Sequence, residues 1–337
     1  MKAAHWIRLL AALLVLGAGF GVAAASSLRA TNRRHTWNSW HAPRVRLAEQ
    51  PFTIATNAPT TTSTTNAPTT TTTDAPRPAP VVHPPAAPQP APPAPAPPPP
   101  STPEPLGVGG SWALTFSDEF SGTALDASKW ATTSSAEADH GQGNPGNQQL
   151  EWDQAQNCSV GNGVLSITAK PDNITSPSGQ HYNWSSCLIT STPSYAFRYG
   201  YIEERAQFPA NKGFWPAFWT WQAPGGPYIE SDVYEYYSDN HTRLYLTQHS
   251  GSGGGCNITL PFDPSAGMHV YGMAILPTGS DWYVDGVKVC HAAGTSTGMT
   301  NIIDDNFVYS GNGNRGLQPA SGSIGVKTID YIRAWQQ

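Results

Sequence analysis

The sequence is poor in charged residues, which make up 12% of its 337 positions, and it has no basic run in its C-terminal two thirds. From residue 106 onward, ten Lys and Arg stand against twenty Asp and Glu. Binding to nucleic acids or sulfated polymers depends on clustered Lys and Arg, so the composition excludes that class of partner. Aromatic residues, at 10%, suit stacking on a neutral ligand instead.

Cysteine is also scarce, and the four residues are Cys158, Cys187, Cys256 and Cys290. They form no C-x-x-C motif, and no two histidines have metal-ligand spacing, so we expect two disulfides in an exported protein rather than a metal site. Four cysteines allow three pairings. Pairing of nearest neighbours would close two loops of roughly thirty residues, each stabilising the fold by about 3 kcal/mol.

The first 105 residues are predicted to lie outside any globular domain. Residues 1–25 have the pattern of a secretory signal, with basic Lys2 and Arg8, an apolar run and three alanines before Ser26; an uncleaved anchor is the alternative. Residues 26–105 form a basic tether and then a Thr-, Pro- and Ala-rich linker, whose composition cannot offset its ordering entropy. Residues 106–337 remain as one domain.

No stretch of a dozen residues in that domain has an amphipathic helical stripe, and the hydrophobic period is two. Leu165 and Ile167 occupy every second position of one run, and Leu244 and Leu246 do so in another. Residues 282–289 predict a hairpin with an Asp-Gly type I′ turn, and residues 324–335 predict a long final strand. The fold class is therefore all-β, a sandwich or a barrel.

Three carboxylates lie within six residues of a strand-like run, Glu230, Asp232 and Glu235. Strands are depleted in acidic residues, so the cluster is unusual. On a regular strand Glu230 and Asp232 share a face and Glu235 takes the other one. A β-bulge between Asp232 and Glu235 would bring all three to the same face.

Crowded carboxylates repel one another, so at least one is expected to keep its proton near neutral pH. A protonated and an ionised carboxyl side by side suit cleavage of a glycosidic bond. A calcium-binding or merely solvated acidic strand is the alternative. Upstream, we expect Trp215 and Trp219 to line a sugar-binding cleft by stacking, and Trp221 to pack in the core.

Several motifs together resemble glycoside hydrolase family 16, the laminarinase-like β-glucanases, over residues 110–337. They are FSDEF at residues 116–120, YGYIEER at 199–205, GFWPAFW at 213–219, the spacing E-x-D-x-x-E from Glu230 to Glu235, WYVDG at 282–286 and IDYIR at 329–333. Residues 300–309 match the family's apolar strand poorly.

The resemblance implies a β-jelly-roll sandwich of two curved antiparallel sheets with a concave substrate cleft, and retention of anomeric configuration. It implies that Glu230 is the nucleophile, Glu235 the general acid/base and Asp232 the residue that orients Glu230. The bulged spacing resembles the endo-β-1,3-glucanase branch. Residues in positions that line the family's subsites are Trp215, Trp219, Arg205, His249 and, in a looser match, Asn147; residues in positions for a structural calcium are Glu119, Gly163 and Asp330.

The sequence therefore predicts a secreted or envelope-held, retaining endo-β-glucan hydrolase, acting on β-1,3-glucan without a catalytic cofactor. A transglycosylase of the same family, or a non-catalytic carbohydrate-binding protein on the same scaffold, is the alternative. We expect a monomer whose partner is a neutral polysaccharide, with membrane contact only if the N-terminal segment is not cleaved.

Overall fold

The computed structural model describes residues 102–192, 194–238, 240–311 and 317–337, and nearly all of their regular structure is β. The predicted signal and almost all of the predicted linker lie outside the described residues. Within the described ranges, no helix has the length and apolar composition needed to cross a membrane. The helices among these residues are two single 3-10 turns, η1 (Pro145–Asn147) and η2 (Ala155–Asn157).

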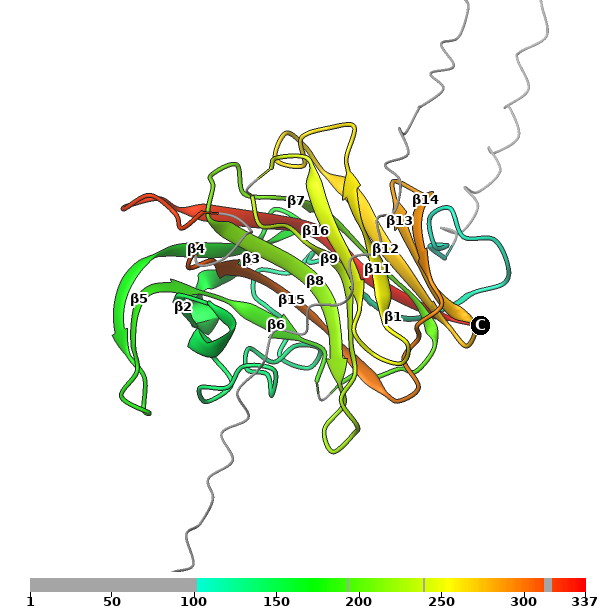
Figure 1. Ribbon diagram of the computed structural model, residues 1–337, viewed down its shortest axis with the longest axis horizontal. Helices are drawn as coiled ribbons and strands as arrows, with labels where there is room; N and C mark the ends of the chain where they lie inside the picture. Colours follow the sequence, from blue (N-terminus) through cyan, green and yellow to red (C-terminus); the bar gives the residue numbers. More distant parts are fainter. Residues whose placement is uncertain (1–101, 193, 239, 312–316) are drawn as a thin grey trace, which may run out of the picture. The chain divides into compact units, whose positions relative to one another are not determined.

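In the described part of the chain, sixteen strands form two sheets packed as a sandwich (Figure 1). The ten-stranded sheet contains β1 (Ala113–Asp118), β2 (Glu151–Asp153), β3 (Cys158–Gly161), β4 (Val164–Thr175), β5 (His181–Ser186), β7 (Gly200–Gln207), β12 (His269–Leu276), β13 (Gly279–Val284), β14 (Val287–Ala292) and β16 (Gly325–Gln336). The six-stranded sheet contains β6 (Leu188–Thr190), β8 (Phe214–Gln222), β9 (Glu230–Glu235), β10 (Arg243–Gln248), β11 (Gly254–Thr259) and β15 (Thr300–Val308).

The predicted fold class is confirmed. Strand pairing is antiparallel throughout, apart from the parallel pair of β2 and β5. The order β11-β10-β9-β8-β15-β6 places β9 in the interior of its sheet, between β8 and β10. The predicted hairpin is β13–β14, where Asp285 and Gly286 both have positive φ, 47° and 76°, as a type I′ turn requires. The predicted final strand is β16.

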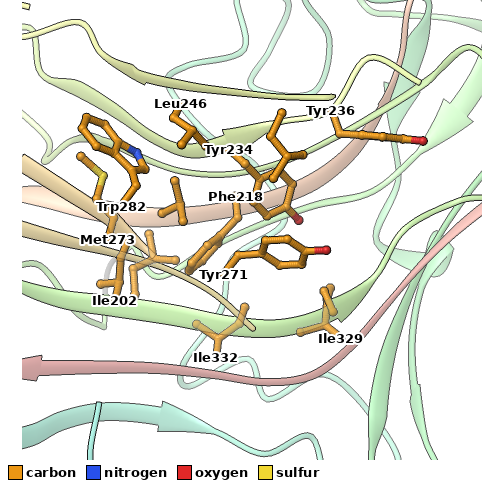
Figure 2. Packing of buried hydrophobic residues seen from close by; sticks show 14 of the residues in the cluster. Ile202, Phe218, Tyr234, Tyr236, Leu246, Tyr271, Met273, Trp282, Ile329 and Ile332 are labelled. Atoms are coloured by element: carbon orange, nitrogen blue, oxygen red, sulfur yellow. The ribbon is translucent and has the colours of Figure 1, made fainter. Parts of the chain in front are cut away.

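The main hydrophobic core lies between the two sheets and takes alternate residues from each (Figure 2). Phe218 of β8 and Leu246 of β10 meet Ile202 of β7, Met273 of β12 and Trp282 of β13 there. The expected alternation of Leu165 and Ile167 in β4, and of Leu244 and Leu246 in β10, is confirmed, since all four side chains are buried in this core. Residues that alternate with the core positions therefore face outward on each sheet.

Two disulfides tie the sandwich together. Cys158 of β3 pairs with Cys187, which precedes β6, and Cys256 of β11 pairs with Cys290 of β14. Both join nearest neighbours in sequence, and the second links an edge strand of one sheet to an edge strand of the other.

Candidate active site

The three acidic residues of β9 lie on the outer face of the six-stranded sheet because the strand carries the predicted β-bulge. Between Asp232 and Glu235, β9 spans three residue steps while β8 and β10 each span two. The Cα pairs with β8 are Trp221 with Glu230, Trp219 with Asp232, and Ala217 with Glu235. Since residues 217, 219 and 221 alternate on one face, the carboxylates opposite them share that face.

The bulge places two consecutive residues, Val233 and Tyr234, in the core between the sheets. Both side chains are almost fully buried, and Tyr234 contacts the rings of Phe208 and Tyr271. Burial of these two side chains holds the extra residue in place. The strand therefore turns Glu235 outward to the face that Glu230 and Asp232 already occupy.

His249 lies directly after β10 and contacts two of the carboxylates. Its Nε2 is 2.8 Å from Asp232 Oδ2 and 3.7 Å from Glu230 Oε1. Burial alone would lower the pKa of His249, but the negative charge of Asp232 and the hydrogen bond to it outweigh that effect and raise the pKa to about 10. The imidazole is thus a cation at neutral pH and compensates the buried Asp232.

Glu230 has a raised pKa and is partly ionised at neutral pH. Burial raises its pKa to about 7, and the charge of Asp232 adds to this effect, whereas His249 and Tyr228 act against it. The expectation that one member of the trio would hold a proton near neutral pH agrees with this shift. Desolvation raises the pKa of Glu230 more than the like-charge repulsion that the sequence led us to expect.

Two tyrosines that the sequence analysis missed hold the two glutamates. Tyr228 Oη donates a hydrogen bond to Glu230 Oε2 at 2.5 Å, and Tyr237 Oη donates to Glu235 Oε1 at 2.6 Å. Each tyrosine is two positions from its glutamate, outside the strand on either side. That period-two spacing was a signal that could have identified them.

The tryptophans of β8 lie on the same outer face. Trp215 stacks on Tyr237 with ring centroids 4.7 Å apart, and Trp219 Nε1 donates to Asp305 Oδ2 at 2.6 Å. Only 5% and 8% of their surfaces are exposed, so each offers an edge rather than a full ring face to a ligand. Trp221 was expected in the core, but it is half-buried on this outer face, edge-on to Tyr228.

Arg205 does not reach this face, which corrects the subsite role that the resemblance implied. Its neighbours on β7, Glu204 and Ala206, are fully buried between the sheets, so Arg205 points outward from the opposite, ten-stranded sheet. There it forms an ion pair with Asp330 at 2.6 Å.

Asn147 is exposed in η1, close to where Gln149 bridges to Tyr309 at the end of β15. Its role in a subsite stays a prediction.

The calcium ligands that the resemblance implied stay a prediction, and the structure gives both carboxylates another partner. Glu119 pairs with Arg333 through two hydrogen bonds, of 2.8 and 2.6 Å, and Asp330 is paired with Arg205. A guanidinium on each carboxylate opposes a divalent cation there. Gly163 lies in the β3–β4 turn, where its backbone carbonyl is the ligand that it could offer to calcium.

Within the described ranges, one set of three ligating side chains has metal-like spacing, Glu230, Asp232 and His249, with ligand atoms within 4.8 Å of one another. In this set the His249 imidazole pairs with Asp232 at 2.8 Å, and its raised pKa means that a metal ion would have to displace a proton from the ring. The set is a hydrogen-bonded charge network that fixes the orientation of two carboxylates. Such a network is suited to acid–base and nucleophilic chemistry.

Comparison with known proteins agrees with this arrangement. The profile of the family described as glycosyl hydrolases family 16 matches residues 145–311, which include all of β9 and His249. The chain contains a family 16 glycosyl hydrolase domain. The family 16 domain has the fold of the laminarinase catalytic domain from Thermotoga maritima MSB8, with a TM-score of 0.60 and 26% identity over 68% of this chain and 99% of that one.

Curated relatives of the family 16 domain carry names of β-glucan-cleaving enzymes. Endo-1,3-1,4-beta-glycanase EglC of Rhizobium meliloti is 28% identical over 66% of this chain and 51% of that protein. Glucan endo-1,3-beta-glucosidase A1 of Niallia circulans is 28% identical over 66% of this chain and 38% of that protein. The chain thus spans about half or less of the length of these relatives.

Proposed function

We propose that the family 16 domain is an endo-β-glucan hydrolase that cleaves internal β-1,3 bonds by double displacement with retention of configuration. The observation that carries this proposal is the bulge in β9, which turns Glu230 and Glu235 to one face with a tyrosine on each. A nucleophile and an acid on one face are the minimum requirement for a retaining glycosidase.

In the first step, ionised Glu230 attacks the anomeric carbon while Glu235 gives its proton to the leaving glycosidic oxygen. A glycosyl ester forms on Glu230 and the aglycone leaves. In the second step, Glu235 takes a proton from water, the water oxygen attacks the anomeric carbon, and Glu230 is released. Asp232, held by His249, orients Glu230 throughout.

The linkage preference rests on the E-x-D-x-x-E spacing and on the relatives. Two relatives are named as endo-1,3-1,4-beta-glycanase and glucan endo-1,3-beta-glucosidase, and a structural neighbour is named as a non-specific endo-beta-1,3(4)-glucanase. We assign β-1,3 as the preferred bond, with mixed-linkage glucan as the secondary substrate. An acidic domain without basic clusters suits a neutral polymer.

The test is Glu230→Gln, with Glu119→Gln as a control glutamate outside the site. Glu230→Gln should reduce hydrolysis of a soluble β-1,3-glucan by at least about a thousandfold, because a neutral amide cannot form the glycosyl ester. Glu119→Gln should retain activity. Unchanged turnover by folded Glu230→Gln contradicts the assignment.

Product analysis by the wild-type protein separates the proposal from its rivals. Hydrolysis predicts short β-1,3-oligosaccharides even at high acceptor concentration, whereas a transglycosylase would give elongated products. Binding without any cleavage would indicate a carbohydrate-binding protein.

We also propose that the protein is exported. The signal-like residues 1–25 and the two disulfides support an oxidising destination outside the cytoplasm.

A further inference from the structure

Three ionisable side chains meet inside the hydrophobic core, away from the proposed catalytic face. Lys327 of β16, Asp304 of β15 and Glu204 of β7 are each fully buried. Strand β15 belongs to the six-stranded sheet, and β7 and β16 are neighbours in the ten-stranded sheet, so the three residues span the sandwich (Figure 1). The two acids of residues 300–309, where the sequence departs from an apolar strand, thus take opposite faces of β15, with Asp304 inward and Asp305 outward.

The lysine is in direct contact with both inward acids. Lys327 Nζ lies 2.5 Å from Asp304 Oδ1 and 3.3 Å from Glu204 Oε1. Its third donor position is directed at the Ala217 carbonyl, 3.2 Å away. The ring of Tyr234 lies 5.0 Å from the ammonium, and its hydroxyl donates a hydrogen bond to Glu204. The amine is therefore held against one carboxyl group, with a second carboxyl beside it.

The second oxygens of both acids, Asp304 Oδ2 and Glu204 Oε2, are buried without a hydrogen-bond partner in the described part of the chain. A buried ion pair with unsatisfied oxygens is unfavourable relative to an uncharged arrangement. Burial, and then the charge of Glu204, raise the pKa of Asp304 well above its usual range. The carboxyls raise the pKa of Lys327 despite its burial, so the resting amine is an ammonium. Its contacts with Asp304 and Glu204 give its proton a path to an acid inside the core.

We propose that Lys327 and Asp304 condense to an intramolecular amide that crosslinks the two sheets, with Glu204 relaying the proton. After proton transfer inside the pair, the neutral Nζ attacks Cγ of the protonated Asp304 carboxyl, and the Nζ–Cγ bond forms. Glu204 accepts a proton from Nζ and returns one to the departing hydroxyl, so that the Cγ–O bond breaks and one water leaves. Ammonium and carboxylate become amide and water, with charge and atoms balanced and no oxidant or cofactor required.

The amide would join β15 to β16 across the core and close a loop over a sequence separation of 23 residues. Such a bond removes the buried charges. It also restricts the conformations of the unfolded chain, as a disulfide does. It would withstand reduction, unlike the bonds Cys158–Cys187 and Cys256–Cys290.

Tryptic mass spectrometry of the reduced full chain tests the proposal directly. If Lys327 is free, trypsin cuts after it and releases residues 316–327 as a separate peptide. If the amide has formed, that cut is lost, and residues 289–315 remain joined to residues 316–333 at their summed mass less one water. We expect the joined pair in essentially all folded protein, and release of residues 316–327 from the folded wild type overturns the proposal.

The matched variants are Glu204→Gln and Glu203→Gln, on neighbouring positions of β7. Glu204 faces the core, whereas Glu203 accepts hydrogen bonds from the Leu106 amide and the Tyr331 hydroxyl. We expect the joined pair to disappear in Glu204→Gln and to persist in Glu203→Gln. If Glu204→Gln does not fold, the wild-type digest still decides. A joined pair of residues 199–205 and 316–333 would place the bond on Glu204 and contradict the role of Asp304.

Discussion

Three neighbours of Glu230 shift its pKa, and they do not all shift it in the same direction. Asp232 and burial favour the protonated form, while the His249 cation and the Tyr228 hydroxyl favour the ionised form. The result is a carboxyl that titrates close to neutral pH, at about 7. A group with this pKa changes its charge within the range where the protein would work, so catalysis should be sensitive to pH on its acidic side.

The pH profile follows from the requirement that Glu230 attack as a carboxylate. Because its pKa is raised to about 7, the fraction ionised falls as pH falls below that value. We expect kcat/KM on β-1,3-glucan to decline by about tenfold for each pH unit below the pKa. Initial rates at substrate concentrations below KM measure this, and a profile that stays level far into the acidic range contradicts it.

Tyr228→Phe should move that acidic limb to higher pH. The substitution removes the hydroxyl that favours the ionised form of Glu230 and leaves the ring against Trp221. A hydrogen bond to a charged group contributes about 1.5–3 kcal/mol, so kcat/KM at neutral pH should fall roughly ten- to a hundredfold. Tyr331→Phe, which removes a hydroxyl bonded to Glu203 on the other sheet, is the control. If both variants keep the wild-type profile, Tyr228 does not position Glu230.

At the scale of the strand, the bulge at Val233 decides which side chains reach the outer face. Pairing with β8 allows two residue steps between Asp232 and Glu235, and Val233 is the additional residue. Removal of Val233 would therefore leave a regular strand in which the three carboxylates still share a face.

Deletion of Val233 should accordingly keep the fold and measurable activity. The lost burial of one valine predicts a decrease of about 1.5–3 kcal/mol in the free energy of unfolding. Deletion of Ser231, by contrast, moves Glu230 to the core face relative to Asp232 and should abolish activity. Thermal unfolding and glucan hydrolysis of both variants measure these effects. If both deletion variants fold and lose activity to the same extent, the alternation of side chains along β9 does not decide which carboxylates reach the outer face.

Element identity was predictable where local periodicity determines it. The alternation in β4 and β10, the Asp-Gly turn of β13–β14 and the bulge in β9 are all confirmed. Strand β15 was not expected to match an apolar strand, yet all nine of its residues are buried. Its acids are accommodated by partners remote in sequence, Lys327 and Trp219, which periodicity does not show.

The site was predictable to the extent that its residues lie on one strand. The predicted subsite role of Arg205 was wrong because a motif match does not say which face of β7 a residue takes. The burial of its two neighbours decides that face. The calcium set stays a prediction; the sequence did not show that arginines from β7 and β16 pair with its two carboxylates. The disulfide pairing was left open because it depends on which sheet edges meet.

Across the whole molecule, a second group of buried acids makes stability depend on pH. These acids are Glu137, Glu151, Asp153 and Asp305, all buried at the outer face of the six-stranded sheet or beside it. Burial raises the pKa of Glu137 to about 7 and that of Glu151 to about 8, and it raises the pKa values of both aspartates well above their usual range. The folded state therefore binds more protons than the unfolded state between mildly acidic and mildly alkaline pH.

The free energy of unfolding should consequently fall as pH rises. The contribution of each acid is fully present below its ordinary pKa and is lost as pH rises through the raised value, on the order of 1.4 kcal/mol per pH unit for one group. Glu151→Gln keeps an acceptor for the Val308 amide and removes one such group. We expect it to stabilise the protein at about pH 8 and to have little effect near pH 5.

Urea unfolding at both pH values measures this difference, with exposed Glu119→Gln as the control that should leave the slope unchanged. If the free energy of unfolding of the wild type instead increases as pH rises, the pKa values of these acids are not raised in the folded protein.

The most direct test of the proposed mechanism is covalent capture of the nucleophile. A 2-deoxy-2-fluoro β-1,3-glucan oligosaccharide with a good leaving group should form a stable glycosyl ester. The fluorine slows both steps because both have oxocarbenium-like transition states, and the good leaving group restores the rate of the first step alone. Tryptic digestion places all three acids in residues 213–243, and fragmentation of that peptide locates the sugar. The account predicts the label on Glu230. A label on Asp232 or Glu235, or an active protein that is never labelled, would contradict it.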